Sequence, residues 1–207
     1  MQTGLDHLVL GIDDLDRGID WVEQRTGVRA IYGGAHPGRG TCNALLSLGP
    51  DRYLEIIAPD PQQTALAWFT RIRELKEPRL LTWAVHTSDL ASLAENIVAA
   101  GFSISGPHDG RRSRPDGKIL SWKLFHLQDN RDGLLPFFIE WGRGSVHPAV
   151  DAPAGCTLDR LRLQSPDVEQ MARTCQLLDV AVDVEHGEHP RLLARITSKR
   201  GEFELTS

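Results

Sequence analysis

Residues 5–15, LDHLVLGIDDL, decide the fold because they join a strand to the start of a helix. Residues 5–12 are typical of a buried strand, and side chains alternate across a strand, so His7 is expected on the face opposite to Asp6. Asp13 and Asp14 offer oxygens of the kind that cap a helix, and apolar residues recur at helical spacing until Gly27. The stretch therefore predicts a strand followed by a helix.

Three more strands are predicted after this helix, at residues 28–32, 43–48 and 52–57, which gives a unit of order β-α-β-β-β. The last of them carries Glu55 within the run YLEII. A carboxylate between apolar neighbours is costly to bury unless another group pairs with it. His7 on the first strand is the expected partner.

The same order of elements begins again twice. Residues 61–78 are predicted to form an amphipathic helical connector, and residues 79–150 a second unit whose last strand, in PFFIEWG, carries Glu140. LDRLRLQSPDV opens a third, shortened unit over residues 151–207. One unit leaves a sheet face apolar, and a neighbouring unit buries that face. We therefore predict an α+β protein in which modules 1–60 and 79–150 are paired, while a degenerate third module packs on the pair or joins a homodimer.

Alignment of the units on their helix caps gives each strand carboxylate a candidate partner. The pairs are His7 with Glu55, Thr82 or His86 with Glu140, and Arg160 with Glu204. Imidazole and carboxylate together suit a divalent first-row metal ion, whereas a guanidinium neutralises a carboxylate without one. The third pair is therefore interpreted as structural. The alternative for the first two is that the histidines are core residues hydrogen-bonded to the glutamates.

The loop HPGRGTCN, residues 36–43, is rich in glycine but does not predict a phosphate site, because a strand and not a helix follows it. Its polar side chains are candidates to bind a substrate carbonyl or carboxylate: His36, Arg39, Thr41 and Asn43. His36 is also a candidate general base. The alternative is a solvated turn, which is also our interpretation of the basic loop that contains Arg112.

Composition narrows the classes of function. The chain has 207 residues, a formal net charge of -5 and a pI near 5.9, which argues against nucleic-acid binding because phosphate recognition needs a concentrated basic face. No apolar stretch is long enough to cross a bilayer, so a membrane partner is not expected. Three cysteines without metal-binding spacing indicate reduced thiols and a cytoplasmic protein.

The repeated units, with LDHLVL, GTCNALLSLG leading to YLEII, and PFFIEWG, resemble the vicinal oxygen chelate superfamily in its glyoxalase-like branch over residues 4–145. The resemblance implies a divalent metal ion (Zn, Ni, Mn or Fe) held by His7, Glu55 and Glu140. Thr82 aligns with the fourth ligand position, and His86, which is displaced from that position, is the candidate fourth ligand.

The activity implied by this resemblance is that of a metal-dependent lyase, isomerase or dioxygenase acting on a small oxygenated organic molecule. His36 and Glu140 are the candidate catalytic groups, and a carboxylate that does not bind the metal would act as the base. Two alternatives stay open. One is a protein that binds or sequesters a small ligand without reaction, and the other is an interaction module built through Arg160 and Glu204.

Overall fold

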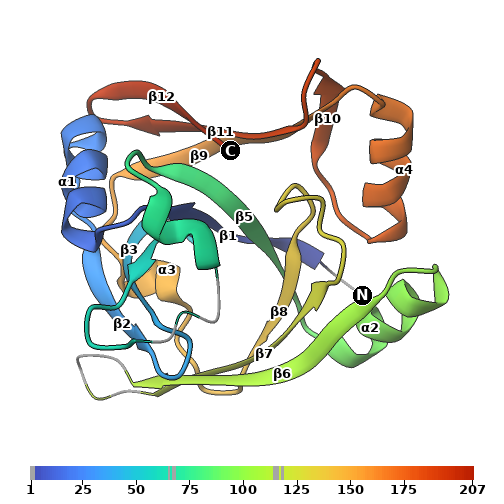
Figure 1. Cartoon of the computed structure of the whole chain (residues 1–207), viewed down its shortest axis with the longest axis horizontal. Coiled ribbons are helices and arrows are strands. Elements are labelled where there is room, and N and C mark those ends of the chain that lie inside the picture. The colour runs from blue at the N-terminus through green and yellow to red at the C-terminus, as the bar shows by residue number, and fades with distance from the viewer. Residues whose placement is uncertain (1–2, 65, 67–68, 114–116, 118) are drawn as a thin grey trace.

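The computed structural model describes residues 3–64, 66, 69–113, 117 and 119–207 (Figure 1). Within them the strands form two sheets, one of eight strands and one of four. The first module contains β1 (Thr3–Gly11), α1 (Leu15–Thr26), β2 (Ile31–His36), β3 (Thr41–Gly49) and β4 (Arg52–Pro59). Asp14 caps α1 by accepting a hydrogen bond from the backbone of Arg17, and Gly27 ends it in the left-handed conformation.

The second module contains β5 (Arg79–Thr87), α2 (Leu90–Ala99), β6 (Ile104–Ser113), β7 (Ile119–Leu127) and β8 (Phe137–Trp141). The connector between the modules differs from the helix expected over residues 61–78. Among its described residues the only helical segment is a short 3-10 turn, Thr70–Glu74. Residues 65, 67 and 68 of that expected helix lie outside the described part of the chain.

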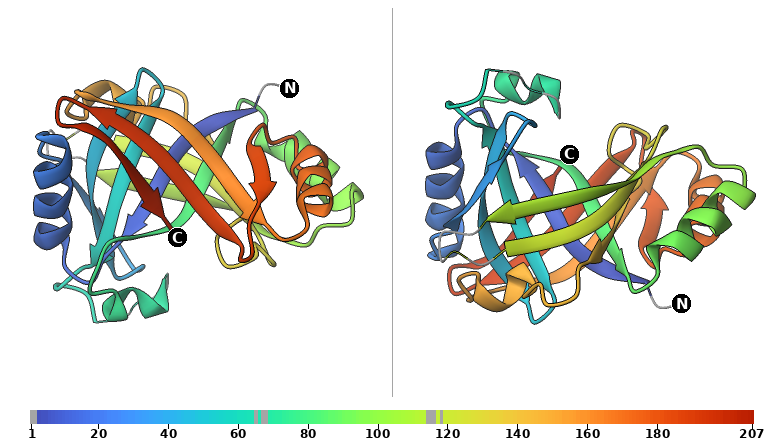
Figure 2. Two further views of the ribbon diagram at one scale, coloured as in Figure 1. Left: turned by 90° about the horizontal axis from the view of Figure 1, so that it is seen from above. Right: turned by 90° about the horizontal axis from the view of Figure 1, so that it is seen from below.

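The eight-stranded sheet has the order β2-β3-β4-β1-β5-β8-β7-β6, and β1 and β5 pair antiparallel at its centre. In each module the first strand lies parallel to the last, β1 beside β4 and β5 beside β8. The predicted pairing of two β-α-β-β-β units is therefore the observed fold. The sheet curls until its two edges, β2 and β6, contact each other (Figure 2), and this curl encloses the inner face.

The C-terminal segment forms a separate sheet. After the short helix α3 (Pro148–Asp151) come β9 (Cys156–Ser165), α4 (Val168–Leu177), β10 (Asp183–His186), β11 (Arg191–Ser198) and β12 (Gly201–Thr206). Their order is β10-β9-β11-β12, so the first strand of this segment does not lie beside its last as it does in the two modules.

The predicted ion pair of the third unit is correspondingly different. Glu204 on β12 pairs with Arg162 and not with Arg160, which instead binds Asp183 at 2.7 Å. Arg162 also contacts Glu185 at 3.1 Å. These charges cover the solvent side of the C-terminal sheet, which supports a structural interpretation of this segment.

The main core lies between the outer face of the curled sheet and the C-terminal sheet. Leu8 and Leu10 of β1 and Trp83 of β5 pack in one cluster with Leu163 and Leu192 of the C-terminal sheet. Residues of α1, α2 and α4 complete it. Full burial of one leucine side chain contributes roughly 2 kcal/mol, so the C-terminal sheet is an integral part of the fold. No helix in the described part of the chain is long and apolar enough to span a membrane.

Candidate functional site

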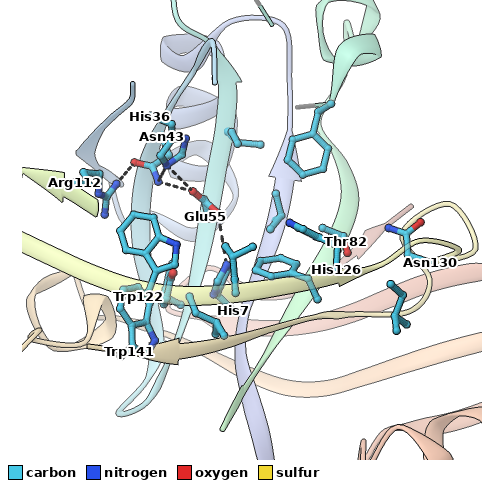
Figure 3. Close-up of a pocket in the computed structure, with 18 of the residues that line it drawn as sticks. His7, His36, Asn43, Glu55, Thr82, Arg112, Trp122, His126, Asn130 and Trp141 are labelled. Atoms are coloured by element: carbon cyan, nitrogen blue, oxygen red, sulfur yellow. Dashed lines mark hydrogen bonds and ion pairs between the residues drawn. The ribbon is translucent and has the colours of Figure 1, made fainter. Parts of the chain in front are cut away.

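A cavity of about 350 Å³ lies on the inner face of the curled sheet and receives side chains from both modules (Figure 3). One end is polar and contains Glu55 of β4 beside Asn43 of β3 and two histidines. Aromatic side chains form much of the remaining wall: Tyr53, Phe69, Trp122, Phe137 and Trp141. A second polar group, around Thr82 and Asn130, lies at the other end. The cavity is within the size range typical of small-molecule sites.

Glu55 is the centre of the first polar end. Its Oε1 accepts a hydrogen bond from Nδ2 of Asn43 and lies 3.6 Å from Nε2 of His36, while its Oε2 lies 3.6 Å from Nε2 of His7. Burial alone would raise the pKa of Glu55, but electrostatic interactions with His36 and His7, the hydrogen bond from Asn43 and the charge of Arg112 together hold it below the usual value. The carboxylate is therefore ionised at neutral pH.

His7 is held by its neighbour Asp6. Its Nδ1 lies 2.6 Å from Oδ1 of Asp6, although alternation along β1 predicted opposite faces for these two residues. The pairing of β1 with β5 passes from Leu5 opposite Val85 directly to His7 opposite Ala84, so Asp6 is the extra residue of a β-bulge. A bulge redirects a side chain in this way. The structure corrects the predicted face of Asp6 for that reason.

Asp6 is fully buried and accepts further hydrogen bonds. Its Oδ2 accepts from Nε1 of Trp141 at 2.9 Å and lies 3.2 Å from Nε2 of His147. Burial raises the pKa of Asp6, but the hydrogen bonds and charges of His147 and His7 outweigh burial and lower it well below the usual value. An ionised carboxylate only accepts hydrogen bonds, so Nδ1 of His7 must carry a proton.

Arg112 links the second module to this end of the cavity. It is buried and donates from a terminal nitrogen to Oδ1 of Asn43 at 2.6 Å. That contact fixes the amide of Asn43, because its oxygen must meet the guanidinium and its NH₂ group is then turned to Glu55. Gly33 and Gly34 of β2 provide the space: a Cβ at either position would lie 3.0–3.1 Å from the Arg112 side chain.

His36 lies at the same end, at the start of the predicted binding loop. Its Nδ1 is 2.8 Å from Oγ1 of Thr41, and its Nε2 is 3.3 Å from Nδ2 of Asn43. Burial is the main cause that lowers the pKa of His36, and the opposing effect of Glu55 is smaller. The imidazole is therefore neutral at neutral pH.

The other end of the cavity is built by the second module. Thr82 of β5 is buried, and its Oγ1 has no hydrogen-bond partner among the described residues. Asn130, in the loop after β7, accepts a hydrogen bond at Oδ1 from the backbone of Gly133 at 3.2 Å. His126 of β7 lies nearby, and burial lowers its pKa to about 4, with smaller contributions from the charges of His108 and Arg39.

The structure brings four of the residues singled out in the sequence together at one end of the cavity, His7, His36, Asn43 and Glu55, and it places Thr82 in the cavity wall at the other end. The other candidates lie elsewhere. Thr41 contacts the His36 ring through its hydroxyl group but does not line the cavity, and Arg39 also lies outside the lining. His86 also lies outside the lining, with its Nδ1 3.7 Å from Oδ2 of Asp6.

Glu140 does not join Glu55. Its Oε2 accepts a hydrogen bond of 2.8 Å from the backbone N–H of Leu90, at the first turn of α2, so its carboxylate lies away from the cavity. Alternation along β8 explains this position, because Phe137, Ile139 and Trp141 are the residues of that strand that line the cavity. The structure therefore corrects the grouping of Glu140 with His7 and Glu55.

The residue of the second module that corresponds to Glu55 is Phe137. Glu55 lies opposite Val9 in the pairing of β1 with β4, and Phe137 lies opposite Ala84 in the pairing of β5 with β8. Val9 and Ala84 are themselves equivalent when the two modules are aligned on the caps of their helices.

The same alignment makes Thr82 the counterpart of His7, so the second module offers a hydroxyl and a phenyl ring where the first offers an imidazole and a carboxylate. No group of three or more His, Cys, Asp or Glu within the described residues is placed to hold a metal ion. The donor set thus does not fit the resident divalent metal ion that the resemblance implies.

Sequence reasoning missed Asp6, Arg112 and Tyr53 as parts of the site. Arg112 was assigned to a solvated loop because aspartates flank its basic run, yet it is only 6% exposed. The pair Gly33–Gly34 in β2 was the available signal, since adjacent glycines in a strand indicate close approach of another group.

Comparison with known proteins agrees with the fold. A hypothetical protein from Staphylococcus aureus of known structure is 18% identical, with a TM-score of 0.69 over 99% of this chain and 85% of that one. A hypothetical protein from Bacillus halodurans is 12% identical, with a TM-score of 0.50 over 70% of this chain and 98% of that one. Methylmalonyl-CoA epimerase from Mycobacterium tuberculosis is 21% identical, with a TM-score of 0.46 over 67% of this chain and 86% of that one.

No curated protein matches the chain in sequence. The model of the glyoxalase-like domain matches residues 5–178, which include both modules of the curled sheet and the first strand and helix of the C-terminal segment. The chain therefore belongs to the glyoxalase-like domain family of the vicinal oxygen chelate superfamily.

Proposed function

We propose that this chain is an enzyme that transfers a proton on a small oxygen-bearing organic molecule, as a lyase or isomerase, with His7 as its general base. The observation that carries the proposal is the contact of the His7 ring with the carboxylates of Asp6 and Glu55. The imidazole lies between two carboxylates, 2.6 Å from one and 3.6 Å from the other, in the wall of the cavity. Titratable groups arranged in this way at a cavity are typical of catalytic sites.

The hydrogen bond to Asp6 determines which nitrogen of His7 reacts. Because Asp6 accepts the proton on Nδ1, a neutral His7 has its lone pair on Nε2, which faces Glu55. Nε2 can then take a proton from a carbon next to a carbonyl group. The resulting imidazolium lies beside the ionised carboxylates of Glu55 and Asp6, which balance its charge.

Arg112 is suited to stabilise the other product of that step. Loss of the proton leaves negative charge on the substrate oxygen, and a fixed cation near this oxygen lowers the barrier to its formation. Among the described residues that line the cavity, Arg112 is the one Arg or Lys. Its contact with Asn43 holds it at the end of the cavity that contains Glu55. Every step proposed here uses the chain's own groups, because Thr82 and Phe137 do not complete a metal site.

Deuterium exchange tests the proposal directly. Benzylacetone, a neutral ketone small enough for the cavity, is incubated with the protein in D₂O, and loss of the proton signals next to its carbonyl is followed by NMR. The wild type is expected to accelerate exchange. Replacement His7→Gln should lower the rate by about a hundredfold or more, as for the loss of a general base.

Glu140→Gln is the matched control, because this carboxyl group contacts α2 and not the cavity. It should leave the exchange rate unchanged. Absence of acceleration by the wild type, or equal rates in the wild type and His7→Gln, would contradict the proposed chemistry.

A second candidate function is the binding of a small ligand without reaction. The hydrogen bonds that both strand glutamates accept favour it, Glu55 from Asn43 and Glu140 from the backbone of Leu90. A binding protein would hold benzylacetone with similar affinity in the wild type and in His7→Gln and would not accelerate exchange in either. Calorimetry of both proteins beside the exchange measurement separates the two functions.

A further inference from the structure

We infer that Thr82 and Asn130 form a second recognition site in the cavity, for an uncharged oxygen at the end of the ligand remote from Glu55. The ligand is then a neutral molecule with an apolar, ring-sized body between two oxygen-bearing ends. This inference rests on the proposed function only in taking the end near Glu55 and His7 as the reacting end.

The hydroxyl of Thr82 points to a missing partner. Thr82 is 4% exposed and lines the cavity, and its Oγ1 has no hydrogen-bond partner among the described residues. A buried hydroxyl without a partner costs stability, so such a group is retained where a ligand satisfies it. A ligand in this cavity that carries an oxygen at this end would provide the missing hydrogen bond.

Asn130 adds a donor at the same end. The backbone N–H of Gly133 donates to its Oδ1, and the backbone N–H of Leu135 donates to its main-chain oxygen at 2.9 Å. Both contacts anchor the residue and assign the amide oxygen to the loop, so its NH₂ group is the part that can meet a ligand. A hydroxyl and an amide NH₂ together suit a carbonyl, ether or hydroxyl oxygen.

The charges of the cavity favour a ligand without net charge. At the end near Glu55 the described lining holds one ionised carboxylate and one guanidinium, Glu55 and Arg112, while His36 is neutral because burial lowers its pKa. At the far end His126 is also neutral at neutral pH, because burial lowers its pKa to about 4. Among the described lining residues no Lys or Arg lies at that end, so a carboxylate placed there would be desolvated without compensation.

The apolar lining sets the character of the ligand's body. Val9, Ile57, Leu124 and Ile139 line the cavity together with the ring of Phe137. Apolar walls of this kind match an aromatic or alicyclic ring, and burial of such a ring supplies most of the binding free energy.

A matched pair of ketones tests the inference. Benzylacetone and its para-hydroxy derivative share the carbonyl end and differ only in a phenol oxygen at the other. Calorimetry should show that the wild type binds the hydroxy derivative about tenfold more tightly, as one well-placed hydrogen bond allows. The para-carboxy derivative should bind more weakly than benzylacetone itself.

Thr82→Val removes the hydroxyl and keeps the shape of the side chain. This variant should bind the two ketones with affinities within about twofold of each other, because the discriminating hydrogen bond is gone. Its affinity for benzylacetone should not change, and its thermal midpoint without ligand should rise, because a buried hydroxyl without a partner has been removed. A variant that retains the wild-type preference for the hydroxy derivative would overturn the inference.

Thr87→Val is the matched control on the same strand. Thr87 is equally buried, but its Oγ1 accepts a hydrogen bond from the backbone of Asp89 at 3.2 Å, and it lies outside the cavity lining. This substitution should lower the thermal midpoint and leave the tenfold preference unchanged. Opposite stability effects at two buried threonines would show that the hydroxyl of Thr82 serves the ligand and not the fold.

Failure of this inference is separable from failure of the proposed function. A preference for the hydroxy derivative that depends on Thr82, without deuterium exchange, supports the second recognition site and contradicts the proton transfer. Exchange that depends on His7 but occurs equally with both ketones supports the proton transfer and contradicts the second recognition site. If none of the ketones binds the wild type, the assignment of a neutral ligand with two oxygen-bearing ends is wrong.

Discussion

Nδ1 of His7 lies 2.6 Å from Oδ1 of Asp6, although the two residues are consecutive in one strand. Consecutive side chains of a regular strand point to opposite faces, and the bulge at Asp6 removes this restriction. The bulge therefore places a buried carboxylate beside an imidazole that faces the cavity. Trp141 and His147 complete the surroundings of that carboxylate, so the orientation of the imidazole is tied to both modules.

Asp6→Asn is expected to impair proton transfer without removing any group from the cavity lining. The asparagine amide can donate to Nδ1 of His7, which would move the imidazole proton to Nε2 and block the nitrogen that faces Glu55. We expect deuterium exchange of benzylacetone to fall by about a hundredfold. Nitrogen NMR of the histidine ring should report the changed tautomer, a signal that a purely structural effect would not produce.

Asp183→Asn provides the comparison for that experiment, because Asp183 forms an exposed ion pair with Arg160 on the C-terminal sheet. Exposed pairs contribute little to stability, so this variant should retain both the exchange rate and the histidine spectrum. Equal exchange rates for Asp6→Asn and the wild type would show that Asp6 does not position His7.

Gly33→Ala should disturb the site through Asn43. A Cβ at this position would lie 2.5 Å from Oδ1 of Asn43 and 3.0 Å from Arg112, in the space that their contact occupies. The amide that donates to Glu55 would have to move, so the exchange rate should fall at least about tenfold because positioning is lost. NMR measurement of exchange, together with a melting curve that shows a folded protein, checks this.

Gly38→Ala separates the effect on the site from the effect on the backbone. Gly38 has φ of 73°, and an added Cβ would meet nothing within 4 Å. We expect a loss of stability of about 1 kcal/mol from the left-handed conformation, with exchange close to that of the wild type. A similar loss of exchange in both variants would argue against a specific role for the space at Gly33.

The paired modules were predictable because local signals agreed with one another. Asp14 and Asp89 mark the starts of two helices at corresponding positions, and both cap those helices in the structure. The C-terminal segment shares the same opening pattern, with Asp167 at its cap, yet its strands pair in a different order. Strand order depends on which face packs against the preceding sheet, and a local pattern does not contain that information.

The first half of the site was predictable and the second half was not, for a related reason. His7 and Glu55 lie in neighbouring strands of one module, and the sequence pattern of that module predicted that they pair. Glu140 was aligned by its sequence context, but strand pairing puts Phe137 at the corresponding position. Asp6 and Arg112 reach the site through a bulge and through the contact of the two sheet edges, both of which arise only when the sheet curls.

His126 should make stability depend on pH in a defined window. Its pKa is lowered from 6.5 to about 4 in the folded protein, chiefly by burial and further by the charges of His108 and Arg39. The unfolded chain therefore takes up this proton first as the pH falls, so stability decreases from about pH 6.5 downward and levels off below about pH 4. The total effect is on the order of 3 kcal/mol.

Urea unfolding of the wild type and His126→Gln over this pH range tests the assignment. Other groups titrate in the same range, so the informative quantity is the difference between the two proteins. The wild type should lose more of its free energy of unfolding than the variant as the pH falls. Parallel curves for the two proteins would mean that His126 is protonated equally in the folded and unfolded chains.

Replacement of Thr82 by His and of Phe137 by Glu should create the metal site that the wild-type donor set does not form. Both positions line the cavity and correspond in the second module to His7 and Glu55, so the double variant would offer two imidazoles and two carboxylates, a set suited to Zn²⁺ or Ni²⁺. Without metal the variant should be less stable than the wild type, because it buries an additional carboxylate. Zn²⁺ should then raise its thermal midpoint strongly and that of the wild type little, because metal binding adds to folding free energy.

Each single variant provides only three ligands and should respond less than the double variant. A wild type that responds to Zn²⁺ as strongly as the double variant would show that His7 and Glu55 already bind metal with other partners.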